Sequence, residues 1–437
     1  MAEQKYTISD IVESYISGDW GNDEPTEEAS CPVSCIRGAD IVPIYNSEFN
    51  NIPLRYISEK SLANRALKEG DIVIEKSGGS PTQSTGRVVY ISKELLEEKQ
   101  NVVCSNFCAA FRIKPEWDAK YVYYYLQHIY NAGVFFNFEG KTSGLKNLIM
   151  DTAFKSITIK EIAIETQRSI ATVLSTIESK MAANRAINHY LEAMAKQLYD
   201  YWFVQFDFPD ANGNPYKSSG GKMVWNDNLN RFVPDGWVDV LFKNICNVKR
   251  GASPRPIDEF MDESHSGIPW VKISDATSSE SPFLTIVKEH IIREGGKKSV
   301  PVTPGTLIVS NSASPGIPKF IEIDACVHDG WLILSGYKEY YRYYFYYVIH
   351  MIRYNLLHMA SGSIFKNLKT DYLKEYCCLN PADSVLQMYD DAIHPIMQKI
   401  LQTQRENESD CSTLNVPPIS LSNVPGISEL NVPSVSL

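Results

Sequence analysis

Residues 166–203 read TQRSIATVLSTIESKMAANRAINHYLEAMAKQLYDYWF and carry the strongest helical pattern in the 437-residue chain. Within this stretch, apolar or small side chains recur in alternating steps of four and three, with asparagine at two central positions. The positions are Ile170, Leu174, Ile177, Met181, Asn184, Asn188, Leu191, Ala195, Leu198 and Trp202. A seam of this kind predicts a long helix packed against a second helix, and buried asparagines often set the register of such a pair.

The same stripe also permits a helix that packs on its own domain. Length favours the helical pair, because the thirty-two steps from Ile170 to Trp202 span about 48 Å at about 1.5 Å per residue.

The chain is internally duplicated with a period of about half its length, since four pairs of segments recur in one order. They are IRGADI (36–41) with VKISDA (271–276), EGDIVI (69–74) with PGTLIV (304–309), YYYL (123–126) with the aromatic run from Tyr343, and KNL (146–148) with KNL (366–368). The first two pairs are displaced by 235 and the last two by 220, so the first half has about fifteen extra residues between Gly70 and Tyr123.

Each half begins with short β-rich runs punctuated by Gly, Pro and Ser, followed by one aromatic helix at residues 120–131 or 340–354. The tyrosines of these helices could stack on nucleic-acid bases, but apolar side chains at helical spacing more often face a core. Residues 385–408 repeat the helical pattern, with Gln387 standing 220 after Gln167. Pro395 should kink this second helix or mark its first turns.

The composition bounds the class of protein. The formal net charge of -10 counts against nucleic-acid binding unless basic residues gather locally or partners supply backbone contacts. Nine scattered cysteines predict reduced thiols. The pairs Cys31/Cys35 and Cys104/Cys108 have a spacing that a zinc site could use, but we favour apolar core positions, with Cys104 and Cys108 on one strand face. No signal sequence or membrane span is evident, so a cytoplasmic location is expected.

Catalytic motifs are missing from the sequence. The GKT at Gly140 lacks the earlier glycine of a phosphate loop, because Phe135 holds that position, and neither G-x-G-x-x-G nor H-E-x-x-H occurs. We therefore expect no catalytic residue and no metal site in this chain.

Six motifs are informative through their order. They are YISGDWG (15–21), CIRGADI (35–41), KTSGLKNL (141–148), the helix of residues 166–203, PDGWVDV (234–240) and SGSIFKNL (361–368). Their order and duplication resemble the specificity subunits of type I restriction-modification systems, over nearly the whole chain up to about Asn407. Similar proteins continue the second helix after a QREN-like segment into a Leu-Arg-Asp-rich stretch, whereas Ser409 here begins a tail in which Asn-Val-Pro recurs every eight residues.

Together with the helical seam, the resemblance predicts an α+β fold with two β-rich target-recognition domains in tandem. Each domain is followed by a long helix, and the two helices pack as an antiparallel coiled-coil spacer. The expected segments are a first target-recognition domain (1–163, the first module), a central helix (164–206), an exposed linker (207–234), a second target-recognition domain (235–381, the second module), a shortened second helix (382–408) and an irregular tail (409–437).

The resemblance also implies that each module reads half of a split target in double-stranded DNA, while the paired helices fix the gap and bind two methyltransferase subunits. Motor and nuclease subunits would complete the restriction enzyme. S-adenosylmethionine, ATP and magnesium are expected on those partners, and no cofactor is expected in this chain. The alternatives are a coiled-coil adaptor or structural protein without DNA specificity, which the acidic charge would suit, and a fused restriction-methylation enzyme.

DNA-reading side chains are expected on loops rich in Arg, Lys, Asn, Gln and Ser, because bases are read by bidentate donors and phosphates by cations. Three loops have this composition: KSGGSPTQSTGR (76–87), VKRGASPR (248–255) and NSASPGIPK (311–319). With the lysines of the two KNL motifs, the candidates are Lys76, Ser80, Gln83, Arg87, Lys146, Lys249, Arg250, Arg255, Asn311, Lys319 and Lys366. For any single one of them, a solvated turn is the alternative.

Overall fold

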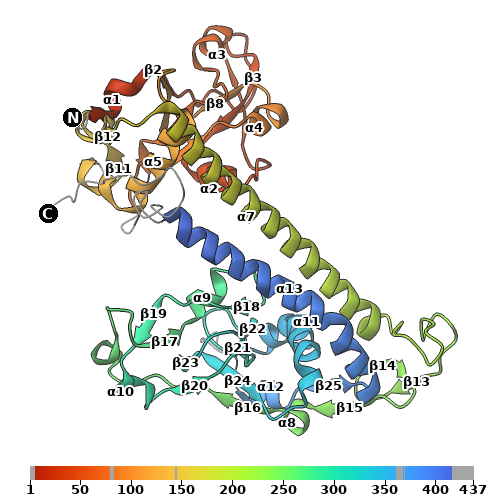
Figure 1. The fold of residues 1–437 in the computed structure, drawn as a ribbon. Helices are drawn as coiled ribbons and strands as arrows, with labels where there is room; N and C mark the ends of the chain where they lie inside the picture. The colour runs from red at the N-terminus through yellow and green to blue at the C-terminus, as the bar shows by residue number, and fades with distance from the viewer. Residues whose placement is uncertain (1–4, 79–82, 143–144, 361–367, 369, 416–437) are drawn as a thin grey trace. The chain divides into compact units, whose positions relative to one another are not determined.

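The computed structural model describes residues 5–78, 83–142, 145–360, 368 and 370–415. The chain divides into two compact units, the first comprising Met1–Asn184 with Glu406–Leu437 and the second Arg185–Arg405. Both boundaries fall inside long helices, α7 (Ile164–Tyr199) and α13 (Asp383–Asn415), so each unit holds part of both helices (Figure 1).

The first unit is built on a four-stranded antiparallel sheet beside a three-stranded mixed sheet. In the four-stranded sheet the order is β2 (Val12–Ser17), β9 (Cys108–Ile113), β5 (Ile72–Glu75), β7 (Val88–Tyr90). In the mixed sheet β3 (Cys31–Ile36) is antiparallel to β4 (Leu54–Ile57) and parallel to β8 (Val102–Cys104). The smaller pairings are β1 (Lys5–Thr7) with β12 (Thr158–Lys160), and β10 (Glu139–Thr142) with β11 (Leu145–Leu148) and β6 (Ser77–Gly78).

The remaining helical elements of the first unit are short, apart from the aromatic helix α5. They are α1 (Ile8–Ile11), η1 (Gly38–Asp40), α2 (Ile41–Tyr45), α3 (Glu59–Arg65), α4 (Lys93–Glu98), α5 (Ala119–Asn131), η2 (Val134–Phe138) and α6 (Met150–Ser156).

The second unit repeats this plan. Its five-stranded sheet has the order β16 (Asn247–Arg250), β24 (Trp331–Ser335), β21 (Leu307–Ser310), β22 (Pro318–Ile321), β18 (Phe283–Leu284). In its mixed sheet β17 (Ile268–Val271) is antiparallel to β19 (Glu289–Ile291) and parallel to β23 (Ala325–Val327), which also pairs with β20 (Val300–Val302). Two pairs complete the strands, β13 (Met223–Asn226) with β14 (Arg231–Pro234), and β15 (Val238–Leu241) with β25 (Cys377–Asn380).

The helical elements of the second unit also include one long aromatic helix, α11. They are η3, a π-helical turn (Asp200–Val204), α8 (Phe242–Ile245), η4 (Ile257–Phe260), α9 (Ile273–Thr277), α10 (Arg293–Gly296), η5 (Glu339–Tyr341), α11 (Arg342–Ala360) and α12 (Thr370–Lys374).

Main-chain hydrogen bonds confirm the duplication at both predicted displacements. Gly70 and Gly305 both have positive φ, which glycine tolerates, and donate to Ile91 O at 3.0 Å and Ile321 O at 2.7 Å, respectively. The two KNL motifs are also equivalent, because Leu148 N donates to Lys76 O and Leu368 N donates to Asn311 O, both at 2.7 Å. The strand orders β2-β9-β5-β7 and β16-β24-β21-β22 are the same.

The tyrosines of the aromatic helices pack in the cores, as helical spacing predicts. Each unit has a large hydrophobic cluster. The buried aromatic rings of α5 lie in the cluster of the first unit, and those of α11 lie in the cluster of the second. The buried tyrosines are Tyr121, Tyr123 and Tyr124 of α5 and Tyr343, Tyr344, Tyr346 and Tyr347 of α11.

Within each unit, α7 and α13 are paired antiparallel. In the first unit Asn184 Nδ2 donates to Asn407 Oδ1 at 3.0 Å, and Asn407 Nδ2 donates to Met181 O at 3.2 Å. In the second unit Asn188 Nδ2 donates to Ile400 O at 3.3 Å, and the hydroxyl of Thr403 donates to Asn188 Oδ1. The predicted α+β fold with helices packed in an antiparallel coiled-coil manner is confirmed.

The remaining seam positions vary in their burial. Ile170, Leu174, Met181, Asn184, Ala195 and Trp202 are buried, whereas Ile177, Asn188, Leu191 and Leu198 are half-buried.

The second helix is longer than expected. It begins at Asp383, holds Pro395 in its interior and continues to Asn415, seven residues beyond the predicted end at Glu408. Residues 409–415 contain no proline to stop it, and Lys180 Nζ pairs with Asp410 Oδ2 at 2.8 Å within the first unit. Pro395 therefore does not mark the first turns. Of the predicted tail, residues 416–437 lie outside the described part of the chain.

Gln387 is not the counterpart of Gln167. At the start of α7, Gln167 N donates to Ala163 O, and at the start of α13, Leu386 N donates to Ala382 O. Gln167 and Leu386 are therefore equivalent, and the displacement here is 219. Leu386 is buried like Gln167, whereas Gln387 is exposed.

The predicted exposed linker is largely folded. Phe208 is stacked between Tyr216 and Trp237, with ring centroids 4.7 and 4.9 Å away, and β13 and β14 form a hairpin. Aromatic side chains among the turn residues explain the difference, since they supply apolar surface that Pro, Gly and Ser lack.

Cys104 and Cys108 also differ from expectation, because they lie on two strands, β8 and β9, joined by a turn at Ser105. The cysteines of the chain are free thiols.

Candidate nucleic-acid interface

In both modules, three chain segments meet at the same place, which we call the loop surface. It comprises the segment after β2 or β16, the turn from β8 to β9 or from β23 to β24, and the segment after β5 or β21. Lys76 N donates to Phe107 O at 2.8 Å in the first module, and Asn311 N donates to Gly330 O at 2.8 Å in the second. All three predicted DNA-reading loops contribute to these surfaces.

One glycine in each module permits this approach. A Cβ atom at Gly18 would collide with the main-chain oxygen of Ser105, and one at Gly251 would collide with that of His328. The following residues, Asp19 and Ala252, donate main-chain hydrogen bonds to the same turns. Gly18 and Gly251 are therefore equivalent, and any side chain there would separate the segments.

On the first loop surface, Arg87 is held by Glu75. Arg87 Nε and Nη2 donate to the two carboxylate oxygens at 2.8 and 2.7 Å, and Glu75 is only 2% exposed. Gly38 and Gly78 flank the carboxylate, because a Cβ at either would crowd Glu75 Oε1. These hydrogen bonds raise the pKa of Arg87. The guanidinium is therefore cationic and fixed in orientation.

Lys146 ties the KNL hairpin to the neighbouring loop. Its Nζ lies 3.2 Å from Glu139 Oε2, donates to Gln83 O at 3.3 Å and sits 5.0 Å from the centre of the Phe136 ring. Gln83 is exposed and Lys76 is half-buried, whereas Ser80 lies outside the described residues. The structure thus brings Gln83 and Lys146 together.

On the second loop surface, Asp329 in the β23–β24 turn faces two arginines. Its Oδ2 lies 3.7 Å from Arg250 Nη2 and 3.5 Å from Arg255 Nη2, and its Oδ1 accepts a hydrogen bond from Ser253 Oγ at 2.6 Å. This last bond is the main cause that lowers the pKa of Asp329, which is therefore ionised at neutral pH. Lys249 is also exposed at this end of β16.

Two of the predicted residues of the second module are buried. Asn311 donates from Nδ2 to Asp329 O at 3.3 Å, so it supports the turn that carries Asp329. Lys319 is 3% exposed, and its ammonium donates to Ser279 O at 2.6 Å and to Ser281 O. Burial lowers the pKa of Lys319 to about 8. Lys319 is thus placed as an internal cation rather than as a surface contact, and Lys366 lies outside the described residues.

Sequence reasoning missed the acidic partners Glu75 and Asp329. Glu75 closes the buried run DIVIE beside the predicted DNA-reading loop of residues 76–87, and a charge at the end of a buried strand was the available signal. Asp329 follows a strand in VHDG, about eighty residues from the arginines that it faces, so no local pattern joins them.

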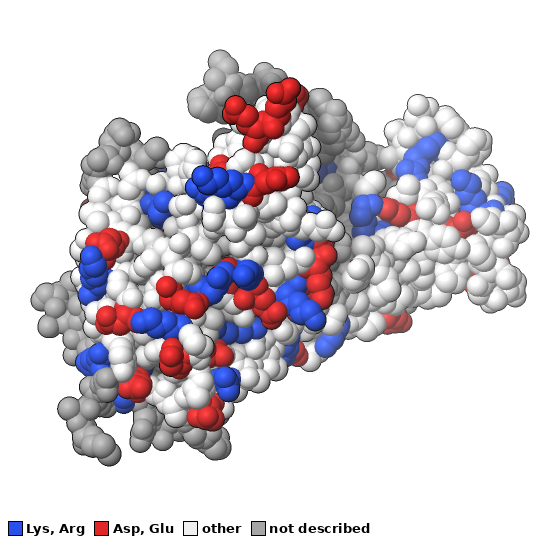
Figure 2. Space-filling view, turned by 90° about the horizontal axis from the view of Figure 1, so that it is seen from above, with Lys and Arg blue, Asp and Glu red and all other residues white. Residues whose placement is uncertain are grey.

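Opposite charges are also mixed on a larger scale. Figure 2 shows Lys and Arg side chains interleaved with Asp and Glu on the face in view. The acidic net charge is therefore compatible with local basic positions such as Arg250 and Arg255.

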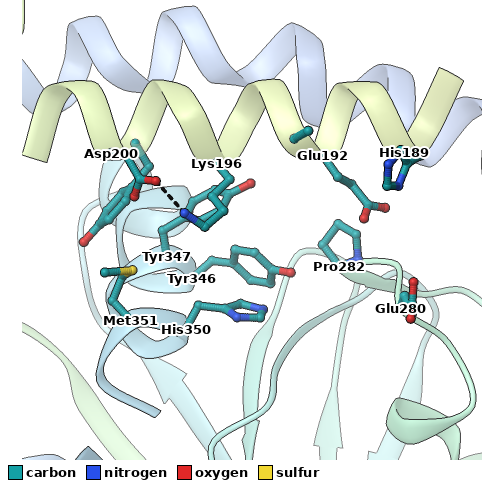
Figure 3. Close-up of a pocket in the computed structure, with 12 residues that line it drawn as sticks. His189, Glu192, Lys196, Asp200, Glu280, Pro282, Tyr346, Tyr347, His350 and Met351 are labelled. Carbon is teal, nitrogen blue, oxygen red and sulfur yellow. Dashed lines mark hydrogen bonds and ion pairs between the residues drawn. The ribbon is translucent and has the colours of Figure 1, made fainter. Parts of the chain in front are cut away.

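A cavity of about 410 Å³ in the second unit has a different character. It is lined by α7, α11 and the turn before β18, and Lys196 and Asp200 form an ion pair at its edge (Figure 3). Burial raises the pKa of Glu192 and lowers that of His350 to about 4. Its lining includes none of the predicted DNA-reading residues that the structure describes.

Two further findings concern the described residues only. No three His, Cys, Asp or Glu side chains in that part of the chain gather as a metal site requires. None of its helices is both long and apolar enough to cross a membrane.

The sequence is similar to those of known DNA specificity proteins. Residues 4–193 match the family model of the type I restriction modification DNA specificity domain. Over these residues the chain is therefore similar to the DNA specificity domain of type I restriction-modification systems. The match begins before the first loop surface and ends within α7, and the predicted resemblance is confirmed.

Similarity to known specificity subunits extends along most of the chain. It is 22% identical over 385 residues to the type I restriction enzyme MjaIX specificity subunit of Methanocaldococcus jannaschii, covering 84% of this chain and 83% of that protein. The crystal structure of the S subunit of a type I restriction-modification system from M. genitalium aligns with a TM-score of 0.57 at 14% identity. It covers 98% of this chain and 96% of that one, which supports the shared fold.

These similarities support DNA recognition within a type I restriction-modification system as the function of this chain, and the resemblance implies a non-catalytic role and assembly with other subunits. The adaptor without DNA specificity is therefore disfavoured.

Proposed function

We propose that the two modules of this specificity chain read different halves of a split DNA target through their loop surfaces. The observation that carries the proposal is that the two surfaces share a main-chain framework and differ in the side chains mounted on it. The shared framework gives both surfaces the same main-chain scaffold. Different hydrogen-bonding side chains on that scaffold would prefer different bases.

The comparison is residue by residue. Glu75 N donates to Arg87 O at 2.9 Å, and Ser310 N donates to Ile317 O at 3.0 Å. Thus the Glu75–Arg87 ion pair of the first module is replaced by Ser310 and Ile317 in the second.

At the end of the first strand of each main sheet, the second module has the charged residue and the first module has a neutral one. Gly18 and Gly251 are equivalent, so the residue before each of them, Ser17 or Arg250, is equivalent too. A cation thus stands in the segment after β5 in the first module (Arg87) and at the end of β16 in the second (Arg250).

The partners that we propose are two methyltransferase subunits that dock on the paired helices, followed by motor and nuclease subunits. Exposed apolar side chains on α7 support docking there, namely Ile187, Tyr190 and Met194. S-adenosylmethionine, ATP and magnesium would be bound by these partners, and this chain would perform no chemical step itself. A cytoplasmic complex would be consistent with this role.

The test is reconstitution with methyltransferase subunits of a type I restriction-modification system from the same source. Methylation of random-sequence DNA should map to one split motif, and binding to that motif should exceed binding to scrambled DNA by about 10³-fold or more at physiological salt. A control complex without this chain should methylate no motif. Methylation without sequence preference by the complete complex would refute the proposal.

A further inference from the structure

The ion pairs of the second loop surface are long and exposed. Arg250 and Arg255 are 55% and 79% exposed in their side chains, and both approach the same oxygen of Asp329 at 3.5 Å or more. By contrast, Arg112 contacts the fully buried Asp71 at 2.8 Å. Exposed and long ion pairs contribute little to stability, so the Asp329 contacts are easily exchanged for others.

Asp329 itself is well positioned. Ser253 Oγ donates to its Oδ1 at 2.6 Å, and Asp329 N donates back to the same hydroxyl at 3.3 Å. Its main-chain oxygen accepts from Arg250 Nε at 2.7 Å. Arg250 therefore stays anchored to the turn when its contact with the carboxylate is lost.

The first module shows that the fold does not require this arrangement. Ser17 occupies the position of Arg250, and the strands on either side keep the same pairing, β2 with β9 and β16 with β24. A cluster that the scaffold can omit, and that lies on the surface assigned to DNA, is better explained by recognition than by folding.

We propose that Asp329 is a specificity-determining residue that occupies the donor groups of Arg250 and Arg255 in the free protein and is displaced by DNA. This inference rests on the proposed function. The carboxylate repels phosphates of every sequence equally. The correct half-site overcomes this repulsion because it offers acceptor atoms that the two guanidinium groups bind in a fixed geometry.

Removing the negative charge of Asp329 should therefore strengthen binding to non-target DNA more than binding to the target. In the reconstituted methyltransferase complex, Asp329→Asn should tighten binding to scrambled DNA by about threefold to fivefold, as expected for one charge removed near phosphates. The affinity for the target should change less, so the ratio of target to scrambled binding falls. The dependence of log K on log salt should steepen by up to about 0.9, because one more net cation is available to DNA.

A matched control is Asp324→Asn. Asp324 is exposed in the same module but lies before β23, at the strand end opposite the turn that carries Asp329. The same change of charge there should leave the binding ratio and the salt slope unchanged.

Coupling to the arginines gives a second and independent test. Arg255→Gln should weaken target binding, and Asp329→Asn should have a smaller effect in that background than alone, since the carboxylate acts through the arginine. Additive effects of the two substitutions would overturn the inference. So would an Asp329→Asn complex that melts at the same temperature as the unsubstituted one and keeps its binding ratio.

The failures of the two proposals are distinguishable. An unsubstituted complex that does not prefer any motif refutes the proposed function. A complex that prefers its motif but is insensitive to Asp329→Asn refutes only the role of Asp329. If Asp329→Asn does not fold, Arg255→Gln decides, because a selective loss at base pairs of the second half-site supports the inference and an unchanged motif opposes it.

Discussion

Asn184 of α7 donates a hydrogen bond from its side-chain amide to the side-chain oxygen of Asn407 of α13, over 3.0 Å. Asn407 in turn donates to Met181 O, so the two amides form a reciprocal polar layer between the helices in the first unit. Such a layer fixes the register of a helix pair, because sliding one helix would leave the buried amide of Asn184 without its partner.

Replacing one member of this layer should therefore destabilise the protein more than replacing both. We expect Asn184→Leu to lower the free energy of unfolding by about 1 to 3 kcal/mol, since it leaves Asn407 without its side-chain partner. The double variant Asn184→Leu/Asn407→Leu should recover most of that loss. Urea unfolding followed by circular dichroism measures both. Equal destabilisation by the single and the double variant would contradict the reciprocal layer.

The length of the helix pair should set the gap between the half-sites. One heptad inserted between Asn184 and Asn188 in α7 alone should weaken assembly, because it separates the contacts of Asn188 from those of Asn184. A second heptad inserted in α13 between Thr403 and Asn407 should restore pairing. The gap in the methylated motif should then grow by about three base pairs, since seven residues rise about 10.5 Å. An unchanged gap in the doubly extended complex would exclude the helices as a ruler.

Gly18 and Gly251 offer a matched pair of substitutions. Gly18→Ala should impair reading of one half-site and Gly251→Ala reading of the other, because each Cβ would push the loop away from its turn. Methylation maps of the two variants should show relaxed preference in different halves of the motif. Relaxation of the same half by both would show that the modules do not read independently.

Lys319 should make the stability depend on pH. Its folded pKa of about 8 is below that of an unfolded lysine, about 10.4, so the unfolded chain holds the extra proton between these values. Stability attributable to this residue is therefore lowest below pH 8 and rises as the pH increases from about 8 to 10.4. Because other groups also titrate there, the measurement is a difference between the intact protein and Lys319→Met.

That difference should favour the intact protein increasingly as the pH rises across this range, by up to a few kcal/mol. Lys319→Met should leave the salt dependence of DNA binding unchanged, because the ammonium is buried against Ser279 and Ser281. A shallower salt slope for this variant would instead indicate that Lys319 contacts phosphate.

Much of the scaffold could be predicted because it leaves local or repeated signals. The displacement of 235 places Gly70 opposite Gly305, and both have the positive φ that a tight turn before a strand demands. Alternating steps of four and three correctly placed Asn184 and Asn188 between the helices. These features follow from periodicity and turn chemistry, which a single sequence carries directly.

The side-chain arrangement at the loop surfaces was less predictable. Lys319 stands in a polar, glycine-containing run that is typical of a surface turn, yet its partners are carbonyl groups 38 and 40 residues away. Asp329 and Arg250 are brought together only by the pairing of β16 with β24. Such contacts depend on which strands become neighbours, and composition alone does not specify that.

The stacking of Phe208 between Tyr216 and Trp237 bears on how genes for such chains can recombine. A crossover near residue 234 would transfer Trp237 with the incoming second module and leave Phe208 and Tyr216 behind, so the three rings would come from different parents. A crossover within α7 before Ala195 would move the whole aromatic cluster together with the hairpin of β13 and β14. Hybrids joined in the helix should therefore inherit a complete second module, whereas hybrids joined at the end of the apparent linker would need to rebuild part of its core.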